Sequence, residues 1–145
     1  MKKTYTGKDK YGSYTLSFED NILYAQIKGA VGQELAKRYN RDFCHLCDQH
    51  KSLSWAFFAK LSACEGYTQD ASEVLSAPHR YAKEKGCVAE AYHVSSPLLI
   101  DQLAKIRQLV GLSSPLKAHI FSTERECVTY LKNHPRIINH QSNKV

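Results

Sequence analysis

Two cysteines and a histidine recur at three-residue spacing in the stretch Cys44-His45-Leu46-Cys47, which is followed by His50. On a helix these side chains would form one row facing a single metal ion, and a cysteine pair one turn apart can also carry redox chemistry. Zinc needs a second ligand pair, but Cys64, Cys87 and Cys127 are isolated in the sequence. Because free cysteine is among the most buried residue types, we interpret the pair as core residues and expect no metal and no cofactor.

A second thiol suggests another chemistry. Cys64 follows one apolar stretch and His93 ends another, so the thiol and the imidazole would meet if both stretches end at the same sheet edge. No orienting acid or glycine run accompanies them. We assign no catalytic residue and favour a non-enzymatic role. The alternative that stays open is a thiol-dependent enzyme or redox protein that uses Cys64 or the Cys44 and Cys47 pair.

The elements that would position these residues begin with a hairpin. Tyr14, Leu16 and Phe18 alternate with polar neighbours, Asp20-Asn21 favours a tight turn, and residues 22–28 return as a second strand. An amphipathic helix over 33–51 follows. The later expected elements are a buried strand at 55–59, a polar loop at 62–69, a helix capped by Asp70, a strand at 88–94, a helix starting at Ser96-Pro97, a short strand at 117–121 and a last helix after Thr123.

This order predicts an α/β fold. Strands that alternate with helices favour right-handed crossovers and parallel pairing, so we expect a mixed sheet of about five strands, with an N-terminal hairpin and then mostly parallel strands, covered by about four helices. We expect a single domain at 13–134. Residues 1–12 are expected to form a flexible basic N-terminal segment, and residues 135–145 a flexible basic tail.

The charge of the chain excludes one class of partner. Of the net charge of +6, residues 1–10 contribute four lysines and one aspartate, and residues 132–145 contribute three basic residues and no acid. The remainder is neutral, whereas a nucleic-acid-binding protein is expected to carry a basic stripe on its folded body. No apolar run reaches the length of a membrane span and no secretory signal is visible, so we expect a cytoplasmic protein with reduced cysteines.

Two stretches carry a resemblance to a known family. Phe57-Phe58-Ala59-Lys60-Leu61-Ser62 looks like the family's central strand with its outgoing loop, and residues 120–131 look like its closing strand and short helix. With the order of elements, they make residues 14–134 resemble the STAS domain, in particular bacterial proteins similar to the sporulation anti-sigma-factor antagonist. The resemblance implies a STAS-like domain that regulates or binds a protein partner.

The regulatory motif of those antagonists is altered here. They carry an Asp-Ser-Ser-Gly stretch whose first serine is phosphorylated, and the matching stretch in this sequence is Asp70-Ala71-Ser72-Glu73. Ala71 stands where the phosphorylated hydroxyl would be, so the resemblance implies that the switch is absent. Ser72 is an ordinary first-turn serine in our interpretation.

The loops after the parallel strands are where a binding site would form, because ligands of open α/β sheets bind outside the carboxyl ends of the strands. We predict a non-enzymatic binding module that contacts a protein partner or a small apolar ligand there; a homodimer is also open. The candidate residues at this edge are Gly29, Ser62, Cys64, Glu65, Tyr67, Ser72, His93, Ser95 and Ser96.

Overall fold

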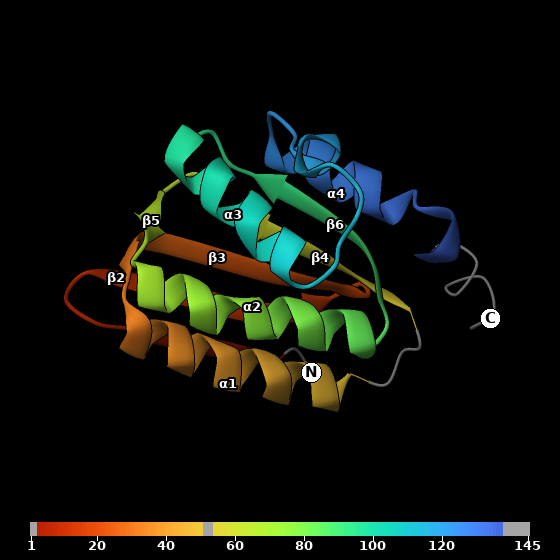
Figure 1. The fold of residues 1–145 in the computed structure, drawn as a ribbon. Coiled ribbons are helices and arrows are strands. Elements are labelled where there is room, and N and C mark those ends of the chain that lie inside the picture. Colours follow the sequence, from red (N-terminus) through yellow and green to blue (C-terminus); the bar gives the residue numbers. More distant parts are fainter. Residues whose placement is uncertain (1–2, 51–53, 138–145) are drawn as a thin grey trace.

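The computed structural model describes residues 3–50 and 54–137. Along the chain the elements are β1 (Thr4–Lys8), β2 (Gly12–Glu19), β3 (Ile22–Val31), α1 (Gln33–Gln49), β4 (Trp55–Lys60), β5 (Cys64–Tyr67), α2 (Gln69–Glu84), β6 (Cys87–His93), α3 (Pro97–Leu109), the 3₁₀-helix η1 (Leu116–His119) and α4 (Glu124–Lys132). The sheet runs in the order β1-β2-β3-β4-β6, and β5 pairs with β3 (Figure 1).

The mixed sheet expected from the sequence is confirmed. β1, β2 and β3 are antiparallel, whereas β4 and β5 pair parallel with β3, and β6 pairs parallel with β4. The β2–β3 turn is made by Asp20 and Asn21, both with positive φ (51° and 67°), which matches the tight hairpin turn expected at these residues. The sheet has six strands, because β1 and β5 join four of the five strands that the sequence indicated, and the fifth, at 117–121, does not form.

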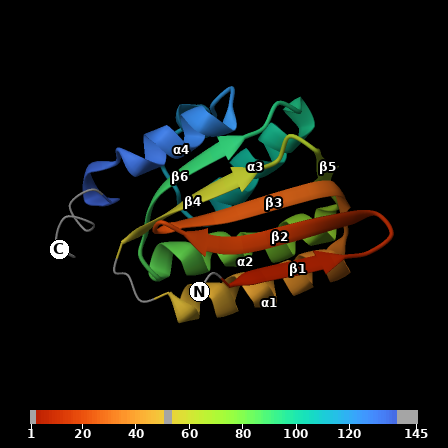
Figure 2. The same cartoon turned by 180° about the vertical axis from the view of Figure 1, so that it is seen from behind.

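Helices cover the two faces of the sheet unequally. Helices α1, α2 and α3 cover one face, against which Phe57, Ala59 and Tyr92 pack. Ala56 and Phe58 point to the other face, where Leu131 of α4 packs against them. Figure 2 shows α4 beside β6 on that side, and on the same side no helix of the described residues lies over β1 to β3.

Three local expectations were wrong. Residues 4–8, assigned to a flexible segment, form the edge strand β1, whose Tyr5 packs against the core despite the surrounding lysines. Residues 64–67, assigned to a polar loop, form β5, which hides Cys64 and Tyr67. Residues 117–121 do not form a strand: Pro115 precedes a 3₁₀-helix, and a single bridge joins Ile120 to Tyr92 of β6.

The packed part of the chain also continues beyond residue 134. Ile137 has no exposed surface and belongs to the cluster under α4. The first three residues of the segment expected to be a flexible tail, 135–137, therefore continue the packed body. Residues 138–145, the rest of that segment, lie outside the described residues.

Candidate functional site

The parallel strands bring the predicted loops to one edge of the sheet. The backbone N–H of Leu61, after β4, donates to the carbonyl of His93 at 2.9 Å, and that of Gly29, in β3, donates to the carbonyl of Ala63 at 2.9 Å. Gly86 lies at the opposite edge, where its carbonyl accepts from the N–H of Trp55 at the start of β4. We call the side at which β3, β4 and β6 end the carboxyl edge.

Several candidate residues at the carboxyl edge hold the fold together. Gly29 has a φ of +75°, and a Cβ there would lie 2.3 Å from the carbonyl oxygen of Tyr11, so no larger residue fits. Cys64 and Tyr67 are buried in the core. Ser96 caps α3, since its hydroxyl accepts from the N–H of Leu99 at 3.3 Å.

The other candidates are open to solvent. Ser62, Glu65 and Ser95 are exposed, whereas Ser72 and His93 are half-buried. His93 turns its Nδ1 to the carbonyl oxygen of Phe121, 3.4 Å away. The edge is therefore a surface made of loops, under which the buried members of the set form the floor.

The helix α2 begins at this edge, but its cap is not the residue expected. The hydroxyl of Thr68 accepts from the N–H of Ala71 at 3.3 Å and donates to Oδ1 of Asp70 at 2.5 Å. Asp70 is the second residue of the helix, where a carboxylate favours the helix dipole. Thr68, and not Asp70, is the cap because β5 ends at Tyr67, which places Thr68 at the turn into the helix.

This assignment gives a prediction about stability. Thr68→Ala leaves the N–H of Ala71 without its acceptor, so we expect the free energy of unfolding to fall by about 1 kcal/mol. Asp70→Ala is the matched control and should cost less, because its contribution is mainly to the dipole. Urea unfolding measures both, and a larger loss in Asp70→Ala would make Asp70 the cap.

The thiols are placed for packing. Burial raises the pKa of Cys64, and burial also raises that of Cys47, so both are protonated at neutral pH. The Nε2 of His50 lies 2.6 Å from Oδ1 of Asn21, and its ring stacks on Phe18. All five cysteines are free, and no group of three His, Cys, Asp or Glu side chains in the described part of the chain is placed to hold a metal ion. No observation supports the thiol-enzyme alternative.

A cavity of about 190 Å³ lies away from the carboxyl edge, beside the first half of β6. Helix α2, helix α3, the loop that follows α3, and α4 with the residues after it supply its walls. We call it the β6 cavity. Its apolar wall includes Phe43, Phe57, Val88 and Leu112, and its polar groups are His79, Lys83, Glu90, Arg107, Ser114, His119 and His134.

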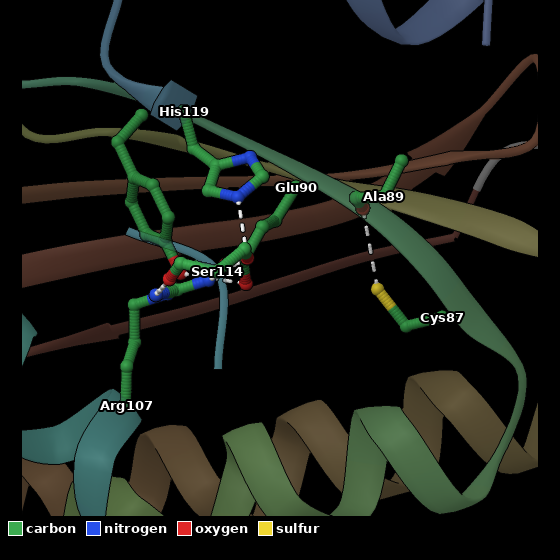
Figure 3. A network of polar contacts seen from close by, with 7 residues as sticks. Cys87, Ala89, Glu90, Arg107, Ser114 and His119 are labelled. Carbon is green, nitrogen blue, oxygen red and sulfur yellow. Dashed lines mark hydrogen bonds and ion pairs between the residues drawn. The ribbon is translucent and has the colours of Figure 1, made fainter. Parts of the chain in front are cut away.

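A buried ion pair forms one side of the β6 cavity. The side chains of Arg107 and Glu90 are 3% and 13% exposed, and Nε and Nη2 of Arg107 both contact Oε1 of Glu90. Arg107 also donates to the carbonyl oxygen of Ser114 at 2.6 Å and to its hydroxyl at 3.1 Å. Figure 3 shows this network, with His119 above Ser114 and the thiol of Cys87 turned to the carbonyl of Ala89.

Histidines border the ion pair from both sides. The Nε2 of His119 lies 2.8 Å from the Ser114 hydroxyl, and its Nδ1 is buried with no hydrogen-bond partner among the described residues. His79 approaches from α2 with its ring edge-on to Phe57 at a centroid distance of 6.0 Å. Burial lowers the pKa of both histidines, while the Glu90 carboxylate acts in the opposite direction.

This cavity was not among the expected sites, although two features of the sequence indicate it. Glu90 is a lone acid in the apolar strand Val-Ala-Glu-Ala-Tyr, and a strand covered on both faces must pair a charge with another charge. Arg107 sits next to Ile106 on the apolar stripe of α3. A charged residue on each of two buried elements is the pattern of a buried ion pair.

No protein-family profile matches this sequence, and no curated protein matches it. Solved structures do share its architecture. An anti-sigma factor antagonist from Mycobacterium paratuberculosis has a TM-score of 0.54 at 17% identity, over 83% of this chain and 93% of that one. The anti-sigma factor antagonist SpoIIAA in its unphosphorylated form has a TM-score of 0.61 at 10% identity, over 83% and 97%. The chain has a STAS-like fold.

A further STAS-like neighbour is also similar over most of its length. An uncharacterised protein from Shewanella loihica with a SpoIIAA-like fold has a TM-score of 0.53 at 11% identity, over 90% of this chain and 93% of that one. At these identities the likeness establishes the fold alone, and the chemistry of a site depends on the side chains of this chain. No helix in residues 3–50 and 54–137 is long and apolar enough to cross a membrane.

Proposed function

We propose that the protein is a non-enzymatic regulatory module that binds a protein partner through the carboxyl edge. The observation that carries this proposal is the position of two exposed hydrophobic side chains. Tyr11 and Leu98 are 65% and 58% exposed. Exposed apolar side chains gathered on one surface, with polar groups around them, are typical of protein interaction sites.

Tyr11 contacts the end of β3, and Leu98 lies beside β5, the strand that pairs with that end of β3. Tyr11 is in the β1–β2 turn, and its carbonyl accepts from the N–H of Ala30 at the end of β3. Leu98 is in the first turn of α3, and its Cδ2 lies 3.4 Å from where a Cβ on Gly66 would be. Figures 1 and 2 both show the β1–β2 turn, β5 and the start of α3 at the same end of the sheet.

The charged side chains on this surface are separated by sign. Lys8 and Lys10 are exposed in and beside the β1–β2 turn, whereas Glu65 and Asp70 are exposed beside β5 and α2. A partner with acidic groups opposite the turn and basic groups opposite α2 is complementary to this arrangement. Such complementarity sets the orientation and rate of binding more than the affinity.

We propose that binding is not switched by phosphorylation at the start of α2. SpoIIAA has been solved in phosphorylated and unphosphorylated forms. In this chain Ala71 is fully buried and carries no hydroxyl at the matching position. The half-buried Ser72 beside it donates its backbone N–H to the carbonyl of Thr68, as expected for an ordinary helical residue.

The same proposal extends to the cellular location of the protein and to the other molecules that could bind at the carboxyl edge. A bacterial regulator of this kind acts in the cytoplasm, where the five free cysteines stay reduced. A small apolar ligand at the carboxyl edge is less favoured, because Cys64 and Tyr67 fill the space under the loops. A second copy of the chain could also bind through Tyr11 and Leu98, so the experiment must distinguish a homodimer from a complex with a different protein.

Photocrosslinking in the native cells tests the proposal. A benzoylphenylalanine placed at Leu98, or in a second variant at Tyr11, should capture the same heterologous protein. The matched control is Leu109, which is 68% exposed at the far end of α3. Leu98→Asp should reduce capture from position 11 by about tenfold, because it places a charge in the apolar centre of the surface.

Three outcomes would contradict the proposal. Adducts that form equally from position 109 would show that exposure alone, and not this edge, determines capture. A product that contains only two copies of the chain would assign the edge to a homodimer. Capture from position 11 that Leu98→Asp leaves unchanged would show that the two side chains do not share a partner.

A further inference from the structure

The β6 cavity has the size and the walls of a small-ligand site. Its volume of about 190 Å³ exceeds the roughly 150 Å³ of an engineered apolar cavity that binds benzene. Phe43, Phe57 and Val88 supply apolar wall on the side of the sheet and α1, and Leu112 supplies it from the loop after α3. One aromatic ring with a small substituent matches this space.

The polar side of the cavity is positively charged once the ion pair is counted. Glu90 is already neutralised by Arg107, whose contacts to Glu90 and Ser114 occupy four of its five N–H groups. Lys83 adds a further cation, and its Nζ lies 3.9 Å from where a Cβ on Gly111 would be. The ammonium is therefore beside the loop that leads into Leu112.

Three imidazoles supply ring nitrogens to the cavity. The Nδ1 atoms of His119 and His134 are buried and make no hydrogen bond of normal geometry among the described residues, although the Glu90 backbone lies near the His119 ring, and His79 lines the same cavity from α2. A buried nitrogen without a partner is costly unless water or a ligand bonds to it. Imidazole N–H groups and an ammonium are donors that suit a carboxylate, whereas the Glu90 carboxylate already has Arg107 as its partner.

We propose that the β6 cavity binds a small aromatic carboxylate, with its ring between Phe57 and Leu112 and its carboxylate between His79, His119 and Lys83. This site is separate from the carboxyl edge, so the inference does not depend on the proposed function. A ligand held there contacts α2, β6 and the loop after α3 together.

The charges around the cavity make binding depend on pH. A carboxylate is held more tightly by a protonated imidazole, and burial keeps the pKa of His79 and His119 below the usual range for histidine. Affinity should therefore rise as the pH falls below about 6.5, where these imidazoles begin to take up a proton. The other titratable or charged groups that line the cavity are Tyr39, Lys83, Cys87, Glu90, Arg107, Tyr130 and His134, of which Cys87 has a pKa raised to about 12 by burial.

Benzoate is the probe for this site, and neutral benzamide is its control. In an amide NMR titration of the full chain at about pH 6, benzoate should give saturable shifts at residues 87–90 and 114–119, and should bind about tenfold more tightly than benzamide. His79→Phe keeps an aromatic ring against Phe57 but removes the N–H, so we expect benzoate affinity to fall about tenfold. His45→Phe, on the exposed face of α1, should leave it unchanged.

A second variant fills the cavity. Leu112→Trp adds bulk from a loop, so it should block benzoate and benzamide alike while the amide spectrum of the core stays dispersed. Equal binding of benzoate and benzamide by the wild type would overturn the assignment of a carboxylate site, whatever the variants do. Shifts that do not saturate, or that lie outside the cavity, would overturn the site itself.

Discussion

Leu103→Asp and Phe57→Asp should each abolish the cooperative thermal transition of the protein. Leu103 of α3 and Phe57 of β4 are 2% and 5% exposed and pack in the same cluster. A carboxylate without a partner in that interior costs several kcal/mol, and the lost apolar contact adds about 2 kcal/mol. Since a domain of this size is stable by only about 5 to 15 kcal/mol, either change consumes most of the stability.

Circular dichroism during heating measures this effect. Leu109→Asp is the matched control, because it makes the same replacement on the same helix at a side chain that is 68% exposed. We expect the free energy of unfolding of this variant to remain within about 0.5 kcal/mol of that of the wild type. A cooperative melt near that of the wild type for Leu103→Asp would mean that α3 does not pack on the sheet through this side.

The elements with strong local signals could be predicted from the sequence. The β2–β3 hairpin combines alternation with two residues that tolerate positive φ, and both Asp20 and Asn21 adopt it. The central strand was recognisable because Trp55–Lys60 is continuously apolar as far as Ala59, and its residues are buried on both faces. The hairpin, the central strand and the helix periodicities together predicted parallel pairing of the later strands and a common carboxyl edge.

Short or edge elements could not be predicted, because their patterns are weak. β1 has only Tyr5 as an inward apolar side chain, and it lies among four lysines that suggested a solvated segment. β5 has four residues, including Gly66, and exists because β3 offers it a pairing edge beyond Gly29. In both cases pairing with a neighbouring strand decides the conformation. The local sequence pattern does not show which strand will lie beside it.

The position of the carboxyl edge could be predicted, but the burial of the residues along it could be predicted only in part. Strand direction determines the edge, whereas strand pairing decides that Cys64 and Tyr67 point into the core. The β6 cavity was missed because its polar groups come from α2, β6, α3 and η1 and from the segments after α3 and α4. Glu90 and Arg107 are 17 positions apart, so their pairing follows from the packing of α3 against the sheet.

Breaking that pair should have a large effect on stability. Arg107→Met removes the cation from a nearly closed site and leaves the Glu90 carboxylate, which is 13% exposed, with the Tyr92 hydroxyl at 3.1 Å as its remaining contact in this network. We expect the free energy of unfolding to fall by about 3 to 5 kcal/mol, mostly from the charge left without its counter-ion. Glu90→Gln should have a comparable effect, because it leaves Arg107 charged and buried.

The double variant Glu90→Met/Arg107→Met separates the cost of an unpaired charge from the value of the pair. Both charges leave the interior together, so urea unfolding should show a smaller loss than in either single variant. The matched control is Lys105→Met, which breaks the exposed ion pair between Lys105 and Asp101 one turn apart on the same helix and should cost less than about 1 kcal/mol. Losses that simply add in the double variant would mean that Glu90 and Arg107 act independently, and the polar wall of the β6 cavity would then lack the neutralised pair on which its net positive charge depends.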